Sequence, residues 1–238
     1  TEEGFANETN WSVMRRDEIY PGWPRYVELR SGHEDGTHWL PAEVNTSIRP
    51  GWYYHPREDH QVKSLPRLVK TYYESIGRNG NFLLNLPVDG RGLVHENDER
   101  QLMALKKQID SDFENELARG QSVTATDVRG SGNTYSAENV NDGNDETYWS
   151  TNDDVIKASI TVSFKKPTEV NRILLQEYIP LGQRVKRFSI EAEVDGSRKK
   201  IDTQTTIGFK RILRFNTVEA SKVRLNIEDA KGPPCISN

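Results

Sequence analysis

The sequence predicts two successive folds, an α/β unit followed by an all-β antiparallel sandwich. Within residues 64–117, two helical apolar patterns enclose one short continuous apolar run, which is an order of elements found in α/β proteins. After Gly120, short segments alternate apolar and polar residues, and no helical pattern follows. The 238 residues therefore divide near positions 118–122 into two domains of ordinary size.

Four segments predict the α/β unit. A short strand at 38–44 is expected to carry Glu43 at its end, and a helix follows at 64–76. The apolar run 81–86 predicts a fully buried parallel strand, and a second helix is expected at 96–117. A helix, a buried strand, a loop and a helix in succession are typical of an α/β barrel or of a doubly wound sheet.

The second half is predicted to be an antiparallel β-sandwich. Its short segments alternate apolar and polar side chains, so that one face of each strand meets a core and the other meets solvent. Turn sequences such as Asp195-Gly196 separate the segments. The alternating segments are 158–164, 172–178, 188–194 and 223–227.

Composition and charge exclude several classes of protein. The chain is polar, with 34% hydrophobic residues, but 9% aromatic residues and five tryptophans are too many for a disordered protein. The net charge of −4 argues against a nucleic-acid partner bound by bulk electrostatics, and no apolar run is long enough to span a membrane. The single cysteine, Cys235, excludes an intrachain disulfide framework and a cysteine-based zinc site.

Chemically active side chains are concentrated in the first half. All five histidines and four of the five tryptophans precede residue 96, and residues 1–119 hold 20 acidic against 15 basic side chains. This grouping favours a functional site. An aromatic-rich loop region exposed to water would give the same composition, so composition alone leaves both interpretations open.

Motifs of the first half resemble one enzyme family. Residues 41–55 read PAEVNTSIRPGWYYH, and residues 72–87 read YYESIGRNGNFLLNLP. With TEEG at 1–4 and NETNW at 7–11, they resemble the α-L-fucosidases of glycoside hydrolase family 29, and in particular the branch that prefers branched, linkage-specific fucosides. The resemblance implies that residues 1–119 are the C-terminal portion of a (β/α)8-type catalytic barrel.

The second half resembles the coagulation-factor type C, or discoidin-like, sandwich. Residues 135–149 read YSAENVNDGNDETYW, and residues 171–178 and 182–188 continue the similarity. The resemblance implies a carbohydrate-binding, galactose-binding-like jelly roll over residues 120–238. Such a sandwich normally has one more strand, so we expect the last strand to be missing here.

The resemblance implies an exo-acting hydrolase that removes terminal α-L-fucose from oligosaccharides or glycoconjugates with retention, without a catalytic cofactor. The family's nucleophile is an Asp after a Trp-Phe pair, and this sequence contains no Trp-Phe-Asp. We therefore expect a C-terminal part of a fucosidase, cut at both ends, with the nucleophile outside it. The alternative is a non-catalytic carbohydrate-binding module attached to an inert barrel remnant.

Catalytic and substrate-binding roles follow from matching the motifs residue by residue. A retaining glycosidase needs two carboxyl groups about 5 Å apart, and the match assigns the acid/base to Glu2. Glu43 is the second choice as acid/base, although a role in binding a sugar hydroxyl or orienting Arg49 is favoured for it. The other expected substrate-binding residues are Arg49 and His55 as hydrogen-bond donors, Trp52 against the C6 methyl of fucose, and Trp39 beside Glu43. For Trp52, packing in the barrel core is the alternative.

One loop of the second half is rich in oxygen ligands. Asp142, Asp145 and Thr147, with backbone carbonyls between them, suit a structural Ca²⁺ ion, and related sandwiches often bind Ca²⁺ here. An Asx-rich turn without metal is the alternative.

The lone cysteine and the tryptophan-rich glycan chemistry favour a periplasmic or secreted bacterial protein.

Overall fold

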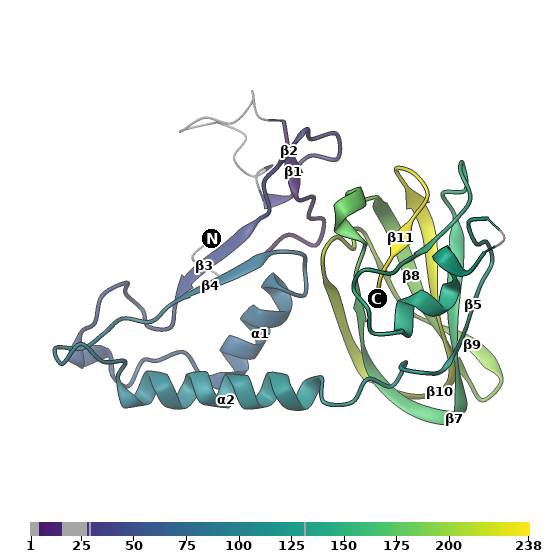
Figure 1. The fold of residues 1–238 in the computed structure, drawn as a ribbon. Coiled ribbons are helices and arrows are strands. Elements are labelled where there is room, and N and C mark those ends of the chain that lie inside the picture. Colours follow the sequence, from purple (N-terminus) through teal and green to yellow (C-terminus); the bar gives the residue numbers. More distant parts are fainter. Residues whose placement is uncertain (1–4, 16–27, 29, 131) are drawn as a thin grey trace.

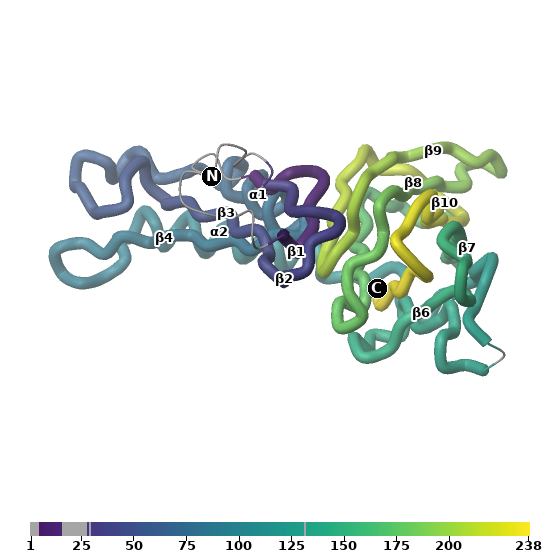
Figure 2. Tube along the Cα trace, turned by 90° about the horizontal axis from the view of Figure 1, so that it is seen from above, coloured from purple at the N-terminus to yellow at the C-terminus, as the bar shows by residue number. Residues whose placement is uncertain are grey.

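The computed structural model describes residues 5–15, 28, 30–130 and 132–238, and it consists of a small α/β unit and a β-sandwich (Figure 1). Seen from above, the purple segment of residues 5–15 lies at the junction between these halves (Figure 2). No helix in the described ranges is long and apolar enough to cross a membrane. The first half contains β1 (Val13–Met14), β2 (His38–Trp39), β3 (Glu43–Ser47), α1 (Leu65–Ser75), β4 (Asn81–Asn85) and α2 (Glu96–Asp112).

The strands β3 and β4 form a parallel pair connected by α1. Glu43 lies opposite Asn81 at one end of the pair, and Ser47 lies opposite Asn85 at the other. Leu68 of α1 and Leu105 of α2 are buried in one small apolar cluster below the strands. The α/β prediction for this half is confirmed at the level of strand, helix, strand and helix, whereas two strands alone do not define a barrel.

Two strand predictions of the first half are wrong in detail. The segment 38–44 is not one strand, because β2 pairs with β1 and β3 begins only at Glu43. The segment 81–86 is not fully buried, since Leu83 is half exposed. Within the described ranges β4 has β3 as its single pairing neighbour, so its other edge and one face lack the cover that a central parallel strand has.

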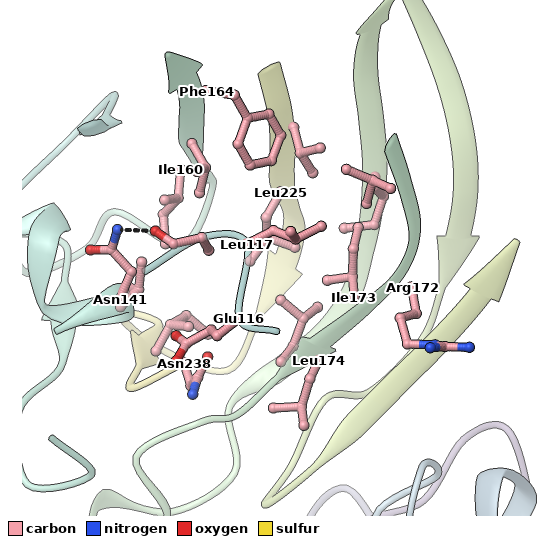
Figure 3. Close-up of a pocket in the computed structure, with 18 of the residues that line it drawn as sticks. Glu116, Leu117, Asn141, Ile160, Phe164, Arg172, Ile173, Leu174, Leu225 and Asn238 are labelled. Atoms are coloured by element: carbon pink, nitrogen blue, oxygen red, sulfur yellow. Dashed lines mark hydrogen bonds between the residues drawn. The ribbon is translucent and has the colours of Figure 1, made fainter. Parts of the chain in front are cut away.

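The helix expected to reach residue 117 ends at Asp112. Arg172 of the sandwich donates to the backbone oxygen of Asp112 at 3.0 Å. Beyond the helix, Leu117 lines an apolar cavity of about 200 Å³ together with Ile160 of the sandwich (Figure 3). The helix therefore ends where contacts with the second half begin.

The second half is built on a five-stranded antiparallel sheet in the order β5-β7-β10-β8-β9, and β6 and β11 form a separate pair. Trp149 and Phe188 are fully buried in the core between these layers. The antiparallel sandwich prediction is confirmed at this level. The strands are β5 (Ser122–Ala125), β6 (Trp149–Ser150), β7 (Ala158–Leu175), β8 (Val185–Val194), β9 (Ser197–Gln204), β10 (Arg211–Ala230) and β11 (Cys235–Ile236).

The strands β7 and β10 are much longer than the sequence pattern predicts. The segments expected at 158–164 and 172–178 are joined, up to Leu175, into the single strand β7. Its register with β10 is interrupted between Ser163 and Thr168, the interval that contains Pro167. A proline cannot donate a backbone hydrogen bond to the neighbouring strand, and β-bulges accommodate it. The alternation of apolar and polar residues is therefore interrupted at this point, although the strand continues.

Candidate functional site

The loop of residues 48–55 displays aromatic side chains beyond the carboxyl end of β3. Trp52 is 45% exposed and Tyr53 is 81% exposed, which is unusual for large aromatic residues. Asn85, at the end of β4, donates to Ser47 Oγ at 3.1 Å and to the backbone oxygen of Trp52 at 2.9 Å. The two parallel strands thus hold the backbone that presents Trp52, at the strand end where barrel enzymes place their chemistry.

Arg49 fixes the base of this loop from inside the protein. Its Nε donates to both carboxylate oxygens of Asp98 at 2.9 and 3.0 Å, and an Nη donates to Asp59 at 2.9 Å. The guanidinium also lies over the ring of Tyr54, 4.7 Å from its centroid. The hydrogen bonds to Asp98, followed by that to Asp59, raise the pKa of Arg49 against the opposing effect of burial, so the charge is permanent.

The expected direct role of Arg49 in sugar binding requires correction. The side chain has no exposed surface, and its donors face two carboxylates of this chain. A group without accessible surface cannot reach a sugar hydroxyl. Arg49 therefore organises the loop, and Asp98 and Asp59 orient it in place of the proposed Glu43.

Trp52 and His55 remain available to a ligand. Both side chains are exposed in this chain. The ring of His95 from the start of α2 stacks on Tyr54 with the centroids 5.9 Å apart, which adds a second contact below the loop. The sugar contacts of Trp52 and His55 stay predictions.

The structure does not bring Trp39 and Glu43 together with Trp52. Glu43 is exposed at the amino end of β3, not at the carboxyl end as expected, and Trp39 lies before it on β2 (Figure 1). Trp52 follows the opposite end of the same strand. Five strand residues span about 13 Å, so Glu43 and Trp52 lie at opposite ends of the strand pair. Glu2, the first choice as acid/base, lies outside the described residues.

The loop proposed to bind Ca²⁺ is closed by its own hydrogen bonds. Asp142 Oδ1 accepts from the backbone N–H of Asn144 at 2.8 Å, and Asp142 Oδ2 accepts from Thr147 Oγ1 at 2.6 Å. Asp145 is exposed. Among the residues that the structure describes, no three His, Cys, Asp or Glu side chains are grouped to hold a metal ion. The contacts are those of the Asx-turn alternative, and the calcium site stays a prediction.

Sequence reasoning missed the residues that build the loop. Asp98, Asp59 and Asn85 have no motif of their own, and Asp98 is 49 positions away from Arg49. Asp98 is an acidic residue in the first turn of a helix. Because the helix dipole alone favours an acidic residue there, its charge did not indicate a partner in the loop.

Two family descriptions match this chain, one in each half. The family described as Alpha-L-fucosidase matches residues 18–111, and the F5/8 type C domain matches residues 122–238. Alpha-L-fucosidase 1 of Arabidopsis thaliana is 34% identical over 99% of the chain and 47% of its own length. The chain thus spans about half the length of the curated relatives that it matches.

Solved structures give the same result. A provisionally named α-L-fucosidase from Bacteroides thetaiotaomicron is 38% identical with a TM-score of 0.94, over all of this chain and 52% of that one. A Ruminococcus gnavus family 29 fucosidase, solved in complex with fucose, is 28% identical with a TM-score of 0.90 over all of this chain and 48% of that one. The resemblance is therefore confirmed: the first half is similar to family 29 fucosidases, and the second half to the F5/8 type C domain.

Proposed function

We propose that this chain forms the C-terminal part of an exo-acting α-L-fucosidase that releases terminal α-L-fucose with retention of configuration. The observation that carries the proposal is the exposed Trp52 on a loop whose sequence resembles the fucosidase signature and whose backbone both parallel strands hold. Two relatives described as α-L-fucosidases, each similar to 99% of this chain, support it. The substrates are fucosylated oligosaccharides or glycoconjugates, and a periplasmic or secreted location suits them.

The proposed mechanism divides the work between this chain and residues outside it. Glu2 acts as acid/base: it protonates the departing glycosidic oxygen and later deprotonates water. The nucleophilic carboxylate is supplied from outside this sequence, which has no Trp-Phe-Asp. Trp52 offers a flat apolar surface to the C6 methyl of fucose, and His55 donates to a hydroxyl.

Arg49 contributes by making the loop rigid. A buried charge is costly unless it is paired, and here two carboxylates and an aromatic ring satisfy one guanidinium. Loops alone hold side chains less precisely than strands or helices do, so this network gives Trp52 and His55 a fixed frame.

Anomer-resolved NMR tests the proposal on the protein encoded by the full reading frame that contains this chain. With an aryl α-L-fucoside, the first fucose released is expected to be the α anomer, which then mutarotates. Release of the β anomer first would exclude retention. Absence of fucose release from both the aryl fucoside and a fucosylated trisaccharide would exclude the proposed activity.

Carbohydrate binding by the sandwich is the second candidate function, and one cleft favours it. A cleft of about 690 Å³ lies at the loop end of the sandwich, lined by Tyr135, Tyr148 and Arg184 among others. Tyr148 stacks on Tyr178 with centroids 4.4 Å apart, which gives the cleft a rigid aromatic wall. Flat aromatic walls with polar groups beside them suit sugar rings.

Calorimetric titration of the 238-residue chain with neutral and fucosylated oligosaccharides tests this second function. Binding that is lost in Tyr148→Ala and kept in Phe209→Ala, a change at an exposed aromatic residue outside the cleft, is the expected result. Binding of equal strength in both variants would place the sugar elsewhere.

A further inference from the structure

The cleft at the loop end of the sandwich carries an excess of positive charge. It is named the tyrosine cleft here, and its lining includes Tyr135, Tyr148, Arg129, Arg184 and Lys231. Among the lining residues that the structure describes, three charged side chains are basic and one, that of Asp153, is acidic. The partners of these four groups show which charges remain for a ligand.

The acidic group of the tyrosine cleft is already paired. Arg129 donates to the two carboxylate oxygens of Asp153 at 2.6 and 3.3 Å, and these bonds raise the pKa of Arg129. The guanidinium also lies 5.9 Å from the centroid of the Tyr135 ring. Arg129 and Asp153 therefore cancel each other's charge, and the net charge of the cleft comes from Arg184 and Lys231.

Arg184 is held in the wall of the cleft by groups other than carboxylates. Its Nη1 donates to the backbone oxygen of Pro233 at 2.7 Å and lies 3.3 Å from Cys235 Sγ. In the part of the chain that the structure describes, no carboxylate forms an ion pair with this guanidinium. The buried carboxyl of Glu177 accepts from the backbone N–H of Arg184 at 2.7 Å, but burial raises its pKa to about 7, so it compensates the Arg184 charge only in part at neutral pH.

Lys231 is the second cation without a carboxylate partner among the described residues. Its Nζ donates to the backbone oxygen of Glu34 and lies 5.2 Å from the centroid of the Trp11 ring. The carboxylate of Glu34 binds Lys186 instead, at 2.8 Å. Lys231 is exposed, so its charge is accessible from the cleft that it lines.

A wall of aromatic rings belongs to the same cleft. The centroids of Tyr135 and Tyr148 are 5.3 Å apart, and Tyr148 stacks on Tyr178 at 4.4 Å. The N–H of Tyr178 donates to the backbone oxygen of Cys235 at 2.9 Å. Because Arg184 contacts the same cysteine, the aromatic wall and the cation are fixed to one another.

We propose that the tyrosine cleft binds an anionic saccharide, whose ring packs on Tyr148 and whose sulfate or carboxylate group binds Arg184 and Lys231. The proposal rests on the second candidate function, carbohydrate binding by the sandwich, and it specifies the class of sugar. Guanidinium and ammonium groups form charge-assisted hydrogen bonds with such anions. The volume of about 690 Å³ falls within the range of about 300–1,000 Å³ for small-ligand sites.

Calorimetric titration of the 238-residue chain with lactose, sulfated lactose and sialylated lactose tests the proposal. At least one anionic sugar is expected to bind at least about tenfold more tightly than lactose, and the two anionic sugars distinguish a sulfate from a carboxylate. Raising NaCl from about 0.05 M to about 0.5 M should remove most of this preference, because salt screens exposed charges.

The outcomes of this titration separate the class of sugar from carbohydrate binding itself. Equal affinity for all three sugars would overturn the proposal and leave carbohydrate binding by the sandwich in place. Absence of binding by all three would overturn carbohydrate binding as well. Both results are obtained with the wild-type chain, so neither depends on the folding of a variant.

Arg184→Met places the anion in the cleft. It is expected to reduce the affinity for the preferred anionic sugar to that for lactose, whereas Arg184→Lys keeps part of the preference because the charge remains. Lys166→Met is the matched control, since Lys166 is exposed on β7 and does not line the cleft. If Lys166→Met weakens binding as much as Arg184→Met does, attraction to the overall charge explains the preference and the site is excluded.

Lys231→Met is a second variant if Arg184→Met does not fold. The exposed Nζ is expected to contribute at least about threefold to the affinity for the anionic sugar and nothing to that for lactose. An unchanged preference in Lys231→Met would contradict Lys231 as a ligand of the anion.

Two further probes test other sources of the anion. Inorganic sulfate is expected to bind at least about tenfold more weakly than the anionic sugar, because it cannot pack on the tyrosine wall. Vesicles of phosphatidylcholine with phosphatidylserine are expected not to bind. Sulfate that binds as tightly as the sugar, or vesicles that bind while all three sugars do not, would overturn a saccharide as the ligand.

Discussion

Arg49 and Asp98 form an ion pair in which neither side chain has any surface exposed to solvent. One partner lies just after β3 and the other in the first turn of α2, so the pair ties the proposed sugar-binding loop to a helix far along the chain. The loop geometry and the stability of the first half depend on the same contact.

Asp98→Asn is expected to reduce the free energy of unfolding by about 3–5 kcal/mol, because it leaves a buried guanidinium without its main counter-charge. Urea denaturation measures the change. Asp110→Asn on the same helix is the control: its pair with Lys106 is exposed, so a loss below about 1 kcal/mol is expected. Similar losses in both variants would show that the buried pair contributes no more to stability than the exposed pair.

Trp52→Ala is expected to lower kcat/KM on fucosides at least about tenfold in the full-reading-frame protein, because it removes an exposed apolar contact surface. The unfolding free energy should stay within about 0.5 kcal/mol of the wild type. Trp39→Ala, on β2 before the amino end of β3, should lose less than about threefold. An unfolded Trp52→Ala protein would show that Trp52 is a core residue.

Glu177 gives the sandwich a pH dependence that is measurable in the 238-residue chain. Burial raises the pKa of its carboxyl from its ordinary 4.5 to about 7, against three backbone N–H donors, those of Val185, Arg184 and Gly208. Between these values the folded protein binds more protons than the unfolded chain. The resulting stability is complete below pH 4.5 and is lost as the pH rises through 7.

Glu177→Gln removes this titration. From about pH 5 to pH 8, the unfolding free energy of the wild type is expected to fall by about 3 kcal/mol relative to the variant. Chemical denaturation at four pH values measures the difference. Parallel curves for the two proteins would show that Glu177 titrates at its ordinary value.

Local sequence patterns predicted the elements that depend on local chemistry. The helix at 64–76 is observed as Leu65–Ser75, because its apolar spacing and its stop at Gly77 act within the segment itself. The helix at 96–117 was predicted too long: it ends at Asp112, whose carbonyl accepts from Arg172 of the sandwich, and Leu117 lines a cavity shared with the sandwich. Periodicity carries no information about such distant partners.

The candidate site was predictable only where a motif named it. The motif around Trp52 identified an exposed loop, but it gave Arg49 the wrong environment, because Asp98 enters from another element. Glu43 lies within the motif and Trp39 just before it, yet β3 separates them from Trp52. Nearness along a strand does not bring residues together, since each residue adds about 3.3 Å.

The 238-residue chain by itself is expected to release no fucose. Retention requires a carboxylate nucleophile opposite the acid, and the family motif that supplies it is absent from this sequence. A discontinuous assay on protein purified from a host without fucosidases measures this. Free fucose above the blank would show that another carboxylate of this chain acts as the nucleophile.

Glu2→Gln in the full-reading-frame protein tests the central claim most directly. Turnover of a fucoside with a poor leaving group is expected to fall by at least about a hundredfold, while an activated aryl fucoside loses much less and azide restores part of the rate. The measurement is kcat/KM on both substrates with and without azide. Equal losses on both substrates and no effect of azide would contradict Glu2 as the acid/base.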